Sequence, residues 1–213
     1  MVKRSYDASR RRASARQTRR AILDAAAELF VEPGYAGARM ADVAEAAGVA
    51  VPTIAAHFGS KKGLLSAVLD VTIAGDDEPV PMAGRSFVAD INALPEARAK
   101  LGRYADELWL TMDRVAGVLL ALESAAAVDA DAAAILAKNS DERLSAMTMF
   151  AAGLLATGDV RPDLGRDAVV SVLVLAMDVR NYDWLVRRRG FDAAAFRDWY
   201  VGSVAGAILG PAG

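Results

Sequence analysis

Residues 40–65 read MADVAEAAGVAVPTIAAHFGSKKGLL, and this stretch decides the fold. It predicts two short helices, at about 40–47 and 51–58. Gly48 follows the first, where a helix can end in the left-handed conformation that glycine adopts without a steric penalty. Pro52 suits the beginning of the second, because the first helical turn makes no use of the N–H that proline lacks.

Three residues of the stretch stand at the spacing that two steeply crossing helices require. Ala44 is small enough to lie where the helices touch, Gly48 turns the chain four residues later, and Ile54 pins the second helix six residues further on. This is the helix-turn-helix arrangement, in which the N-terminal part of the second helix enters the major groove of DNA.

Helical patterns flank the stretch on both sides. The preceding helix is expected to begin near Ser14 or Thr18, each of which can cap a helix, and to end at Pro33. Ser60 can cap a following helix. Residues 1–13 are basic and without periodicity, so a flexible tail is expected there. The apolar residues at helical spacing are Ile22, Ala26, Leu29 and Phe30 before the stretch and Leu64, Leu65, Val68 and Leu69 at its end.

The remainder predicts a helix bundle. Alanine accounts for 46 of the 213 residues and costs least to place in a helix, and the regular Val/Ile/Thr alternation of a sheet is missing. A loop is expected at 75–84. Amphipathic helices are expected at about 95–112, 114–128, 130–156, 166–188 and 192–209. The chain is therefore expected to be all-α.

The charges are divided unevenly along the chain. Residues 1–62 carry a balance of +5 and residues 63–213 a balance of −7, which indicates a polyanion partner at one end. The absence of cysteine excludes disulfides and thiolate metal sites. The most apolar run, 168–177, is too short to cross a bilayer, and no secretory signal is present at the N-terminus. A soluble, cytoplasmic protein is expected.

Further elements surround the helix-turn-helix at fixed positions. A Leu-Phe pair ends the first helix at 29–30, a Gly-Tyr turn follows at 34–35, and Val-Ala-x-x-Ala-Gly-Val occupies 43–49. His-Phe-x-x-Lys-x-x-Leu closes the series at 57–64. Over roughly residues 18–65 the chain resembles the tetracycline-repressor (TetR) family of transcriptional regulators.

The resemblance implies an organisation and a function. A three-helix helix-turn-helix domain at 14–62 would stand on a helix-bundle body at 63–213 that dimerises and binds a small-molecule ligand. The ligand would release a repressor from its DNA operator, with no cofactor and no enzymatic activity. One alternative is a helix-turn-helix adaptor without an inducer pocket. Another is an all-helical enzyme using Asp106, Glu107 and Glu123, which no paired carboxylate, Ser–His pair or metal spacing supports.

The expected DNA contacts come from the second helix and its flanks. At its beginning Thr53 can hydrogen-bond to a base edge, while Val51 and Pro52 can only pack there, Val51 on a thymine methyl. His57 is expected to contact a phosphate, although a lone histidine is usually a packing or surface residue. The resemblance gives the same role to Lys61, which is otherwise an ordinary solvated lysine.

Two positions depart from the family pattern. Ala55 stands where a tyrosine hydroxyl usually reaches a phosphate, so that contact is missing. Arg39 replaces a capping Thr or Ser, and its longer side chain can reach the DNA backbone instead. The N-terminal arginines form either a solubilising tail or an arm that adds phosphate or minor-groove contacts. They are Arg10, Arg11, Arg12, Arg16, Arg19 and Arg20.

The resemblance also implies a ligand cavity in the body. Methionine and aromatic side chains suit an adaptable apolar pocket, although each is also an ordinary core residue of a bundle. Glu123 is either a polar anchor of the pocket or part of the wet stripe of its helix. The residues expected to line the pocket are Tyr104, Trp109, Met112, Glu123, Met147, Phe150 and Met177.

A homodimer is expected from the last two helices. The run at 168–177 is more continuously apolar than a helix with one wet face should be. Gly202 and Gly206 recur at four-residue spacing, and glycine inside a helix costs about 1 kcal/mol relative to alanine. Another backbone is therefore expected close by, either that of a second chain or that of a neighbouring helix in the same chain.

Overall fold

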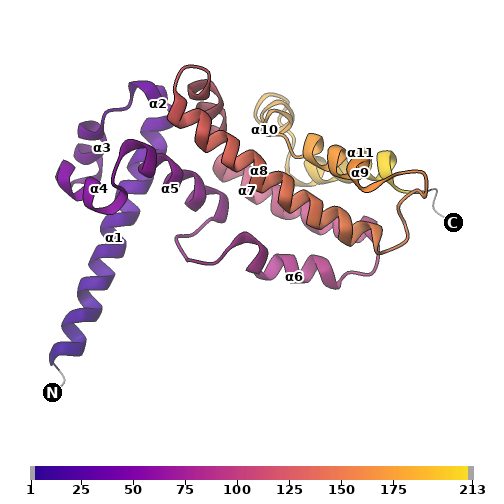
Figure 1. Ribbon diagram of the computed structural model, residues 1–213, viewed down its shortest axis with the longest axis horizontal. Coiled ribbons are helices and arrows are strands. Elements are labelled where there is room, and N and C mark those ends of the chain that lie inside the picture. Colours follow the sequence, from indigo (N-terminus) through magenta and orange to yellow (C-terminus); the bar gives the residue numbers. More distant parts are fainter. Residues whose placement is uncertain (1–2, 211–213) are drawn as a thin grey trace. The chain divides into compact units, whose positions relative to one another are not determined.

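The computed structural model describes residues 3–210, with side chains described for residues 10, 11 and 13–210 (Figure 1). Every regular element in this part of the chain is helical, which confirms the all-α prediction. A single antiparallel bridge pairs Val160 with Leu209. The elements are α1 (Lys3–Val31), α2 (Gly34–Gly37), α3 (Met40–Ala47), α4 (Val51–Phe58), α5 (Lys61–Ala74), the 3-10 helix η1 (Met82–Gly84), α6 (Ser86–Ala93), α7 (Ala97–Ala126), α8 (Ala130–Leu155), α9 (Arg166–Ala176), α10 (Val179–Tyr182), the π-helix η2 (Asp183–Arg188) and α11 (Ala193–Ile208).

The chain divides into two compact units. The first combines the chain up to Asp77 with residues Gly117–Leu136, so α1 to α5 pack with the end of α7 and the beginning of α8. The second combines Glu78–Ala116 with the chain from Ala137 onward. The division by function, into a tail at 1–13, a DNA-binding domain at 14–62 and a body at 63–213, remains a prediction.

Within the first unit, α3 and α4 form the predicted helix-turn-helix with the predicted bounds. Helix α3 ends at Gly48, whose φ of +67° is left-handed. The N–H groups of Gly48 and Val49 donate to the carbonyls of Glu45 (3.1 Å) and Ala44 (2.9 Å), which satisfies carbonyls at the helix end. Ala44 and Ile54 are both buried. Helix α1 packs on α3 and α5, and α4 packs on the same two helices, so α3 and α5 together position α4.

Helix α1 begins at Lys3, so the expected start near Ser14 or Thr18 is wrong. Residues 3–20 contain no glycine or proline and are rich in arginine and alanine. Nothing in this composition interrupts a helix that propagates toward the N-terminus from its packed end. The predicted apolar face is correct, since Ile22, Ala26 and Phe30 are buried.

Two helices of the body also differ from expectation. Helix α7 is continuous where a break at Asp113 was expected. Asp113 lies on an exposed face of the helix and accepts a hydrogen bond from the hydroxyl of Tyr182 (3.2 Å), so it needs no turn. Conversely, residues 166–188 are not one helix. Helix α9 ends at Ala176, and the carboxylate of Asp178 accepts from the N–H of Arg180 (2.8 Å) to begin a new one.

Polar contacts between distant residues hold the second unit around the beginning of α7. The buried Lys100 donates from Nζ to the carbonyls of Ile91 (3.0 Å) and Asn92 (2.9 Å) at the end of α6, a helix that the sequence did not predict. The carboxylate of Asp159 accepts from the N–H of Ala97 (2.7 Å). Helices α9 and α11 pack against each other. Among the described helices, none has the length and apolar character needed to cross a membrane.

The turn between α4 and α5 requires glycine at position 63. A Cβ there would collide with the backbone carbonyl oxygen of Phe58. The backbone has little room to move away, because the N–H of Gly63 donates to Oγ of Ser60 (3.1 Å), the predicted cap of α5. We expect Gly63→Ala to lower the free energy of unfolding by about 1–3 kcal/mol, measured by urea denaturation.

The control is Gly153→Ala in α8. A Cβ at Gly153 would meet Oδ1 of Asn92 at 3.8 Å, an ordinary contact distance. This variant should be neutral or more stable by up to about 1 kcal/mol, because alanine favours a helix over glycine. Equal unfolding free energies for the two variants would contradict the collision at position 63.

Candidate nucleic-acid interface and ligand residues

Helix α4 presents its N-terminal end to solvent. Val51, Pro52 and Ala55 are exposed, whereas Ile54 on the opposite side is fully buried. Thr53 is half-buried beside the exposed residues. The side chains predicted to meet base edges therefore lie at an accessible helix end. The small exposed side chain of Ala55 leaves no group there to reach a phosphate.

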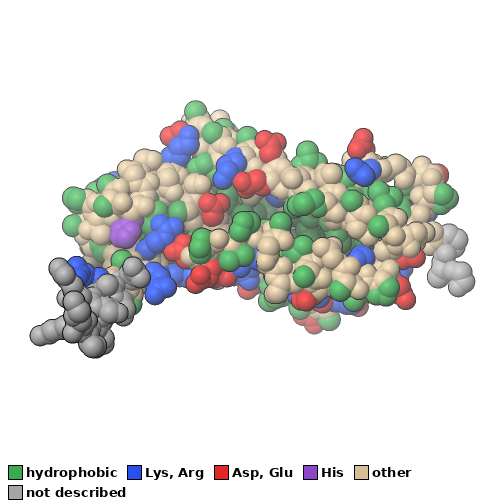
Figure 2. All heavy atoms as spheres, turned by 60° about the horizontal axis from the view of Figure 1, so that its bottom comes forward, with side chains coloured by type: hydrophobic (Ala, Val, Ile, Leu, Met, Phe, Trp, Pro, Cys, Tyr) green, Lys and Arg blue, Asp and Glu red, His purple; other side chains and the backbone are tan. Residues whose placement is uncertain are grey.

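His57 lies one turn further along α4 and is half-buried. Figure 2 shows the histidine at the surface with lysine or arginine side chains close beside it. Its ring lies near that of Phe58, with 6.0 Å between centroids. This position is compatible with the predicted phosphate contact and also with a packing role.

Arg39 occupies the N-cap position of α3 without capping it. Its guanidinium instead donates two hydrogen bonds to the carboxylate of Asp42, from Nε (2.9 Å) and Nη2 (2.6 Å). These bonds hold the pKa of Asp42 below its ordinary value and raise the pKa of Arg39. Arg39 is highly exposed, so it is accessible to DNA, but a phosphate would have to compete with Asp42.

Lys61 lies in the first turn of α5 and packs over an aromatic ring of its own unit. Its Nζ is 4.4 Å from the ring centroid of Tyr35. Burial lowers the pKa of Lys61, an effect that the negative charge of Asp129 partly offsets. Burial raises the pKa of Tyr35, and the carboxylates of Asp129 and Asp131 raise it further. Lys61, which was predicted to contact a phosphate, is thus half-buried beside the ring of Tyr35 and near the carboxylates of the α7–α8 turn, Asp129 and Asp131.

The neighbouring Lys62 links α5 to the beginning of α8. Its Nζ forms an ion pair with the carboxylate of Asp131 (2.9 Å) at the beginning of α8. The carboxylate of Asp129 accepts from the N–H groups of Asp131 and Ala132, each at 2.9 Å, and so caps that helix. The beginning of α5 is therefore tied to the α7–α8 turn within the first unit.

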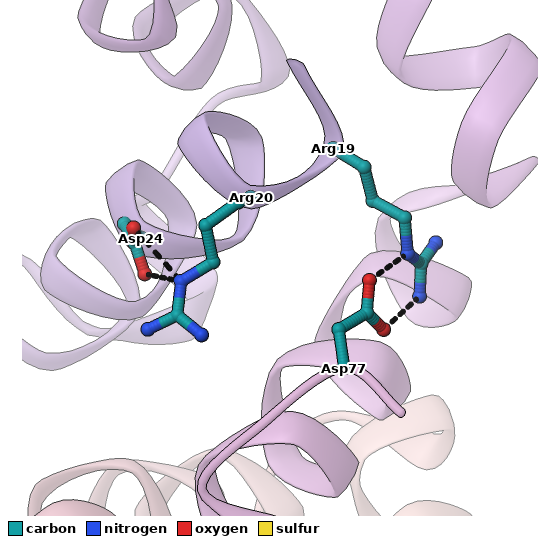
Figure 3. Close-up of polar contacts among 4 residues, drawn as sticks. All are labelled: Arg19, Arg20, Asp24 and Asp77. Atoms are coloured by element: carbon teal, nitrogen blue, oxygen red, sulfur yellow. Dashed lines mark hydrogen bonds and ion pairs between the residues drawn. The ribbon is translucent and has the colours of Figure 1, made fainter. Parts of the chain in front are cut away.

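Two of the N-terminal arginines bind carboxylates of the protein (Figure 3). Arg19 donates from Nε to Asp77 (2.6 Å), and its guanidinium carbon lies 4.7 Å from the ring centroid of Phe58. Arg20 pairs with Asp24 four residues along α1 (2.9 Å). Arg16 is exposed. Arg19 therefore joins α1, α4 and the segment after α5, a role that the sequence did not indicate.

The predicted ligand residues fall into separate groups. Tyr104 stacks on Phe150 with 4.8 Å between centroids, and its hydroxyl donates to Sδ of Met177 (3.7 Å). Trp109 packs instead on Tyr182 and Phe196, at 5.6 and 5.7 Å. Met112 and Met147 are buried in the second unit. Glu123 is half-buried in the first unit, so the structure does not place it with the other six.

Three polar residues of the second unit were not predicted. Asn139 and Arg143 lie on α8 at four-residue spacing from the buried Met147, and Tyr200 lies on α11 with its ring 5.7 Å from that of Tyr104. The four-residue spacing was the signal available in the sequence, since it places both polar residues on the inward face of the helix.

This geometry defines a class of protein. Two short helices are joined at a glycine turn, and the exposed beginning of the second stands beside cationic side chains. This arrangement, formed by α1 to α5 and called the head below, is that of a helix-turn-helix protein. The other regular elements of the described chain are helical as well.

Comparison with known proteins identifies a family model for part of the chain. Residues 22–68 match the model described as "Bacterial regulatory proteins, tetR family". The HTH-type transcriptional repressor ComR of Escherichia coli K12 is 48% identical over 52 residues, 24% of this chain and 25% of that protein. The tetracycline repressor protein class D of Escherichia coli is 35% identical over 95 residues, 43% of each chain. The matched stretches thus span a quarter and less than half of these relatives.

The likeness in fold extends over most of the chain. The crystal structure of a TetR-family transcriptional regulator from Rhodococcus sp. superimposes with a TM-score of 0.68 at 22% identity, covering 90% of this chain and 98% of the other. Residues 22–68 therefore carry the sequence signature of the TetR family of bacterial regulatory proteins. The sequence match carries this assignment for the head, and the body shares the fold.

The Arg19–Asp77 ion pair should contribute measurably to the stability of the head. Both side chains are about one-third exposed. In a double-mutant cycle of Arg19→Met and Asp77→Asn, we expect a coupling energy of about 0.5–1 kcal/mol, measured by urea denaturation. Methionine keeps an apolar side chain against Phe58 while removing the charge.

The matched control is the neighbouring pair Arg20–Asp24, whose side chains are more than half exposed. Solvent screens this pair more strongly, so the same cycle should give a smaller coupling energy. A coupling energy for Arg20–Asp24 equal to or larger than that for Arg19–Asp77 would show that Arg19 has no special role in joining the helices.

Proposed function

We propose that the protein is a DNA-binding transcriptional repressor of the TetR type, acting in the cytoplasm as a homodimer that a small-molecule ligand releases from its operator. The observation that carries the proposal is the accessible beginning of α4, held by the glycine turn in the position where helix-turn-helix proteins meet the major groove. The cationic balance of residues 1–62 supports a polyanion partner for this part of the chain.

Specific roles follow for the residues of the head. Thr53 would read base edges, with Val51 and Pro52 packing beside it. His57, Arg39 and Lys61 would contact phosphates, which position the protein without reading sequence. Two of these cations have partners in the free protein, and DNA would have to replace the contact between Arg39 and Asp42.

The proposal that the protein represses transcription and is released by a ligand is supported by the names of its relatives. Two similar proteins are named as a transcriptional repressor and a tetracycline repressor. The second of these names points to a small molecule as the regulator. For this chain the body would hold such a ligand within the second unit, where Tyr104, Phe150 and Met177 gather.

The homodimer is supported by apolar and small residues left exposed on α9 and α11. Ala168 and Leu175 are exposed two turns apart on α9, Leu175 at 70%. Gly202 and Gly206 are exposed on α11, and a Cβ added to either would meet nothing within 4 Å. No neighbour among the described residues therefore explains these glycines, and close approach of a second copy would.

DNA binding should depend steeply on salt. With a mixed-sequence duplex in a fluorescence-anisotropy titration, Lys61→Ala should weaken binding and reduce the slope of log K against log salt by about 0.9, the contribution of one phosphate. Thr53→Ala should keep the slope but change which sequences are enriched from a random duplex library, because base contacts carry specificity.

The control for this titration is Lys138→Ala, which removes an exposed lysine of the second unit. Its salt slope should equal that of the wild type. A Lys61→Ala slope that matches the wild type would remove Lys61 from the interface. No measurable binding of any duplex at low salt would overturn the proposed function.

Sedimentation velocity at micromolar concentration should show a dimer. Gly206→Trp fills the open space on α11 without disturbing its own chain, so we expect a folded monomer. Ala137→Trp, at an exposed position of α8, is the control and should remain dimeric. A monomeric wild type would refute the homodimer, and a dimeric Gly206→Trp would place the interface elsewhere.

A further inference from the structure

Three polar groups on α8 and α11 are buried without a hydrogen-bond partner among the described residues. They are Oδ1 of Asn139, Nε of Arg143 and the hydroxyl of Tyr200. The Tyr200 side chain is fully buried, and Asn139 is 5% exposed. Buried polar groups are nearly always hydrogen-bonded, so three without such a partner on two helices of one unit require an explanation.

Tyr104 connects these groups in space. Its ring packs on those of Phe150 and Tyr200, and its hydroxyl reaches only the sulfur of Met177. Arg143 lies two turns before Phe150 on α8 and so on the helix face that carries this ring. Burial raises the pKa of Tyr104, and the positive charge of Arg143 acts in the opposite direction. Helices α7, α8, α9 and α11 thus bring one cation and two hydroxyls to one aromatic cluster.

The protonation states of the cluster are those of hydrogen-bond donors. Burial raises the pKa of Tyr200, with a further contribution from Tyr104, so both phenols keep their protons at neutral pH. Arginine is always charged in proteins. Asn139 lies one turn before Arg143 and offers an acceptor.

The guanidinium of Arg143 has no carboxylate to neutralise it. No ion pair or hydrogen bond joins it to another residue in the described part of the chain. The other two arginines with a buried Nε differ, because Arg161 pairs with Asp163 (3.8 Å) and Arg85 has other interactions. A partly buried charge without a partner is costly to the folded state, and the packing of the helices gives no reason to keep it.

We infer that this cluster binds a carboxylic acid with an apolar body: Arg143 and Tyr200 hold the carboxylate, and Tyr104 and Phe150 pack on the body. The inference rests on the proposed function, since it names the class of ligand that would act on the repressor. An anion supplies the acceptors that the guanidinium of Arg143 and the hydroxyl of Tyr200 lack. Asn139 then accepts from an O–H or N–H group of the ligand or from a bridging water.

The same residues argue against a cationic ligand. Aromatic rings alone would suit a quaternary ammonium group. Arg143 adds a positive charge to the cluster, and charges of the same sign repel strongly where water is excluded. A neutral ligand would fill the apolar part but leave the guanidinium without a counter-charge.

The test compares ligands that differ only in charge. The probes are 3-phenylpropionate, octanoate, the two corresponding alcohols and phenyltrimethylammonium, titrated calorimetrically into the full-length protein. At least one acid should bind about tenfold or more tightly than its alcohol, because a hydrogen bond to a charged group is lost in the alcohol. The ammonium probe should not bind.

Variants then assign the contact to Arg143. Arg143→Met should weaken the acid by about tenfold or more and leave alcohol binding within about twofold. Tyr200→Phe should cause a smaller loss of acid affinity. Lys138→Met removes an exposed cation from the same helix and should change neither affinity.

The unfolding temperature of the ligand-free protein gives a second readout. Because Arg143→Met removes a buried charge without a partner, its Tm should equal or exceed that of the wild type, by up to about 2–4 °C. A lower Tm together with weaker alcohol binding would mean that Arg143 is structural, which overturns the inference.

The remaining outcomes separate the two proposals. Equal binding of acids and alcohols, or binding of no acid, overturns the carboxylate site even where the protein binds DNA normally. Acid binding by a protein that binds no DNA keeps the site and overturns the repressor.

Discussion

The packing of α3 against α4 sets the geometry on which the helix-turn-helix depends. Ala44 is almost fully buried, and Ile54 is completely buried on the other helix. Because α3 and α5 together hold α4, a change in their packing would turn the exposed side chains at the beginning of α4 as a group. The left-handed turn at Gly48 and the absence of a Cβ at Gly63 fix the two ends of the same short helix. Every proposed base contact therefore depends on backbone packing that the contact residues do not themselves provide.

The cations of the head interact largely with the protein itself. Arg19 binds Asp77, Arg39 binds Asp42 and Lys62 binds Asp131, while Lys61 packs on Tyr35. Counting basic residues therefore overstates the charge that is free to meet a polyanion. Each partner also fixes the direction of a long side chain, which would lower the entropy lost in the proposed binding of DNA. The acidic residues of the first unit thus determine where its cationic side chains point.

Short-range patterns predicted the head well because its determinants are local. The bounds of α3 and α4 follow from one glycine, one proline and the apolar spacing between them. The body was harder because single polar residues are ambiguous there. Asp113 indicated a turn but lies on the wet side of a continuous helix, whereas Asp178 does begin a new one. Glu123 and Arg143 are also single polar residues whose roles the sequence leaves ambiguous, in this case at the proposed ligand site. The sequence favoured the acid, which belongs to the first unit, and passed over the arginine, whose importance comes from neighbours on three other helices.

The π-helix at Asp183–Arg188 affects how this chain aligns with its relatives. A π-turn holds one residue more than an α-turn, and here the N–H of Arg189 reaches back five residues to the carbonyl of Trp184 (3.0 Å). The π-helix, with its extra residue, lies between Tyr182 and Phe196 in the sequence, and the rings of these two residues are 5.6 Å apart. A relative with one residue fewer in this segment can form a plain α-helix and keep the same two rings in contact. A gap at this point of an alignment then marks a change in helix type, and the residues on either side remain equivalent.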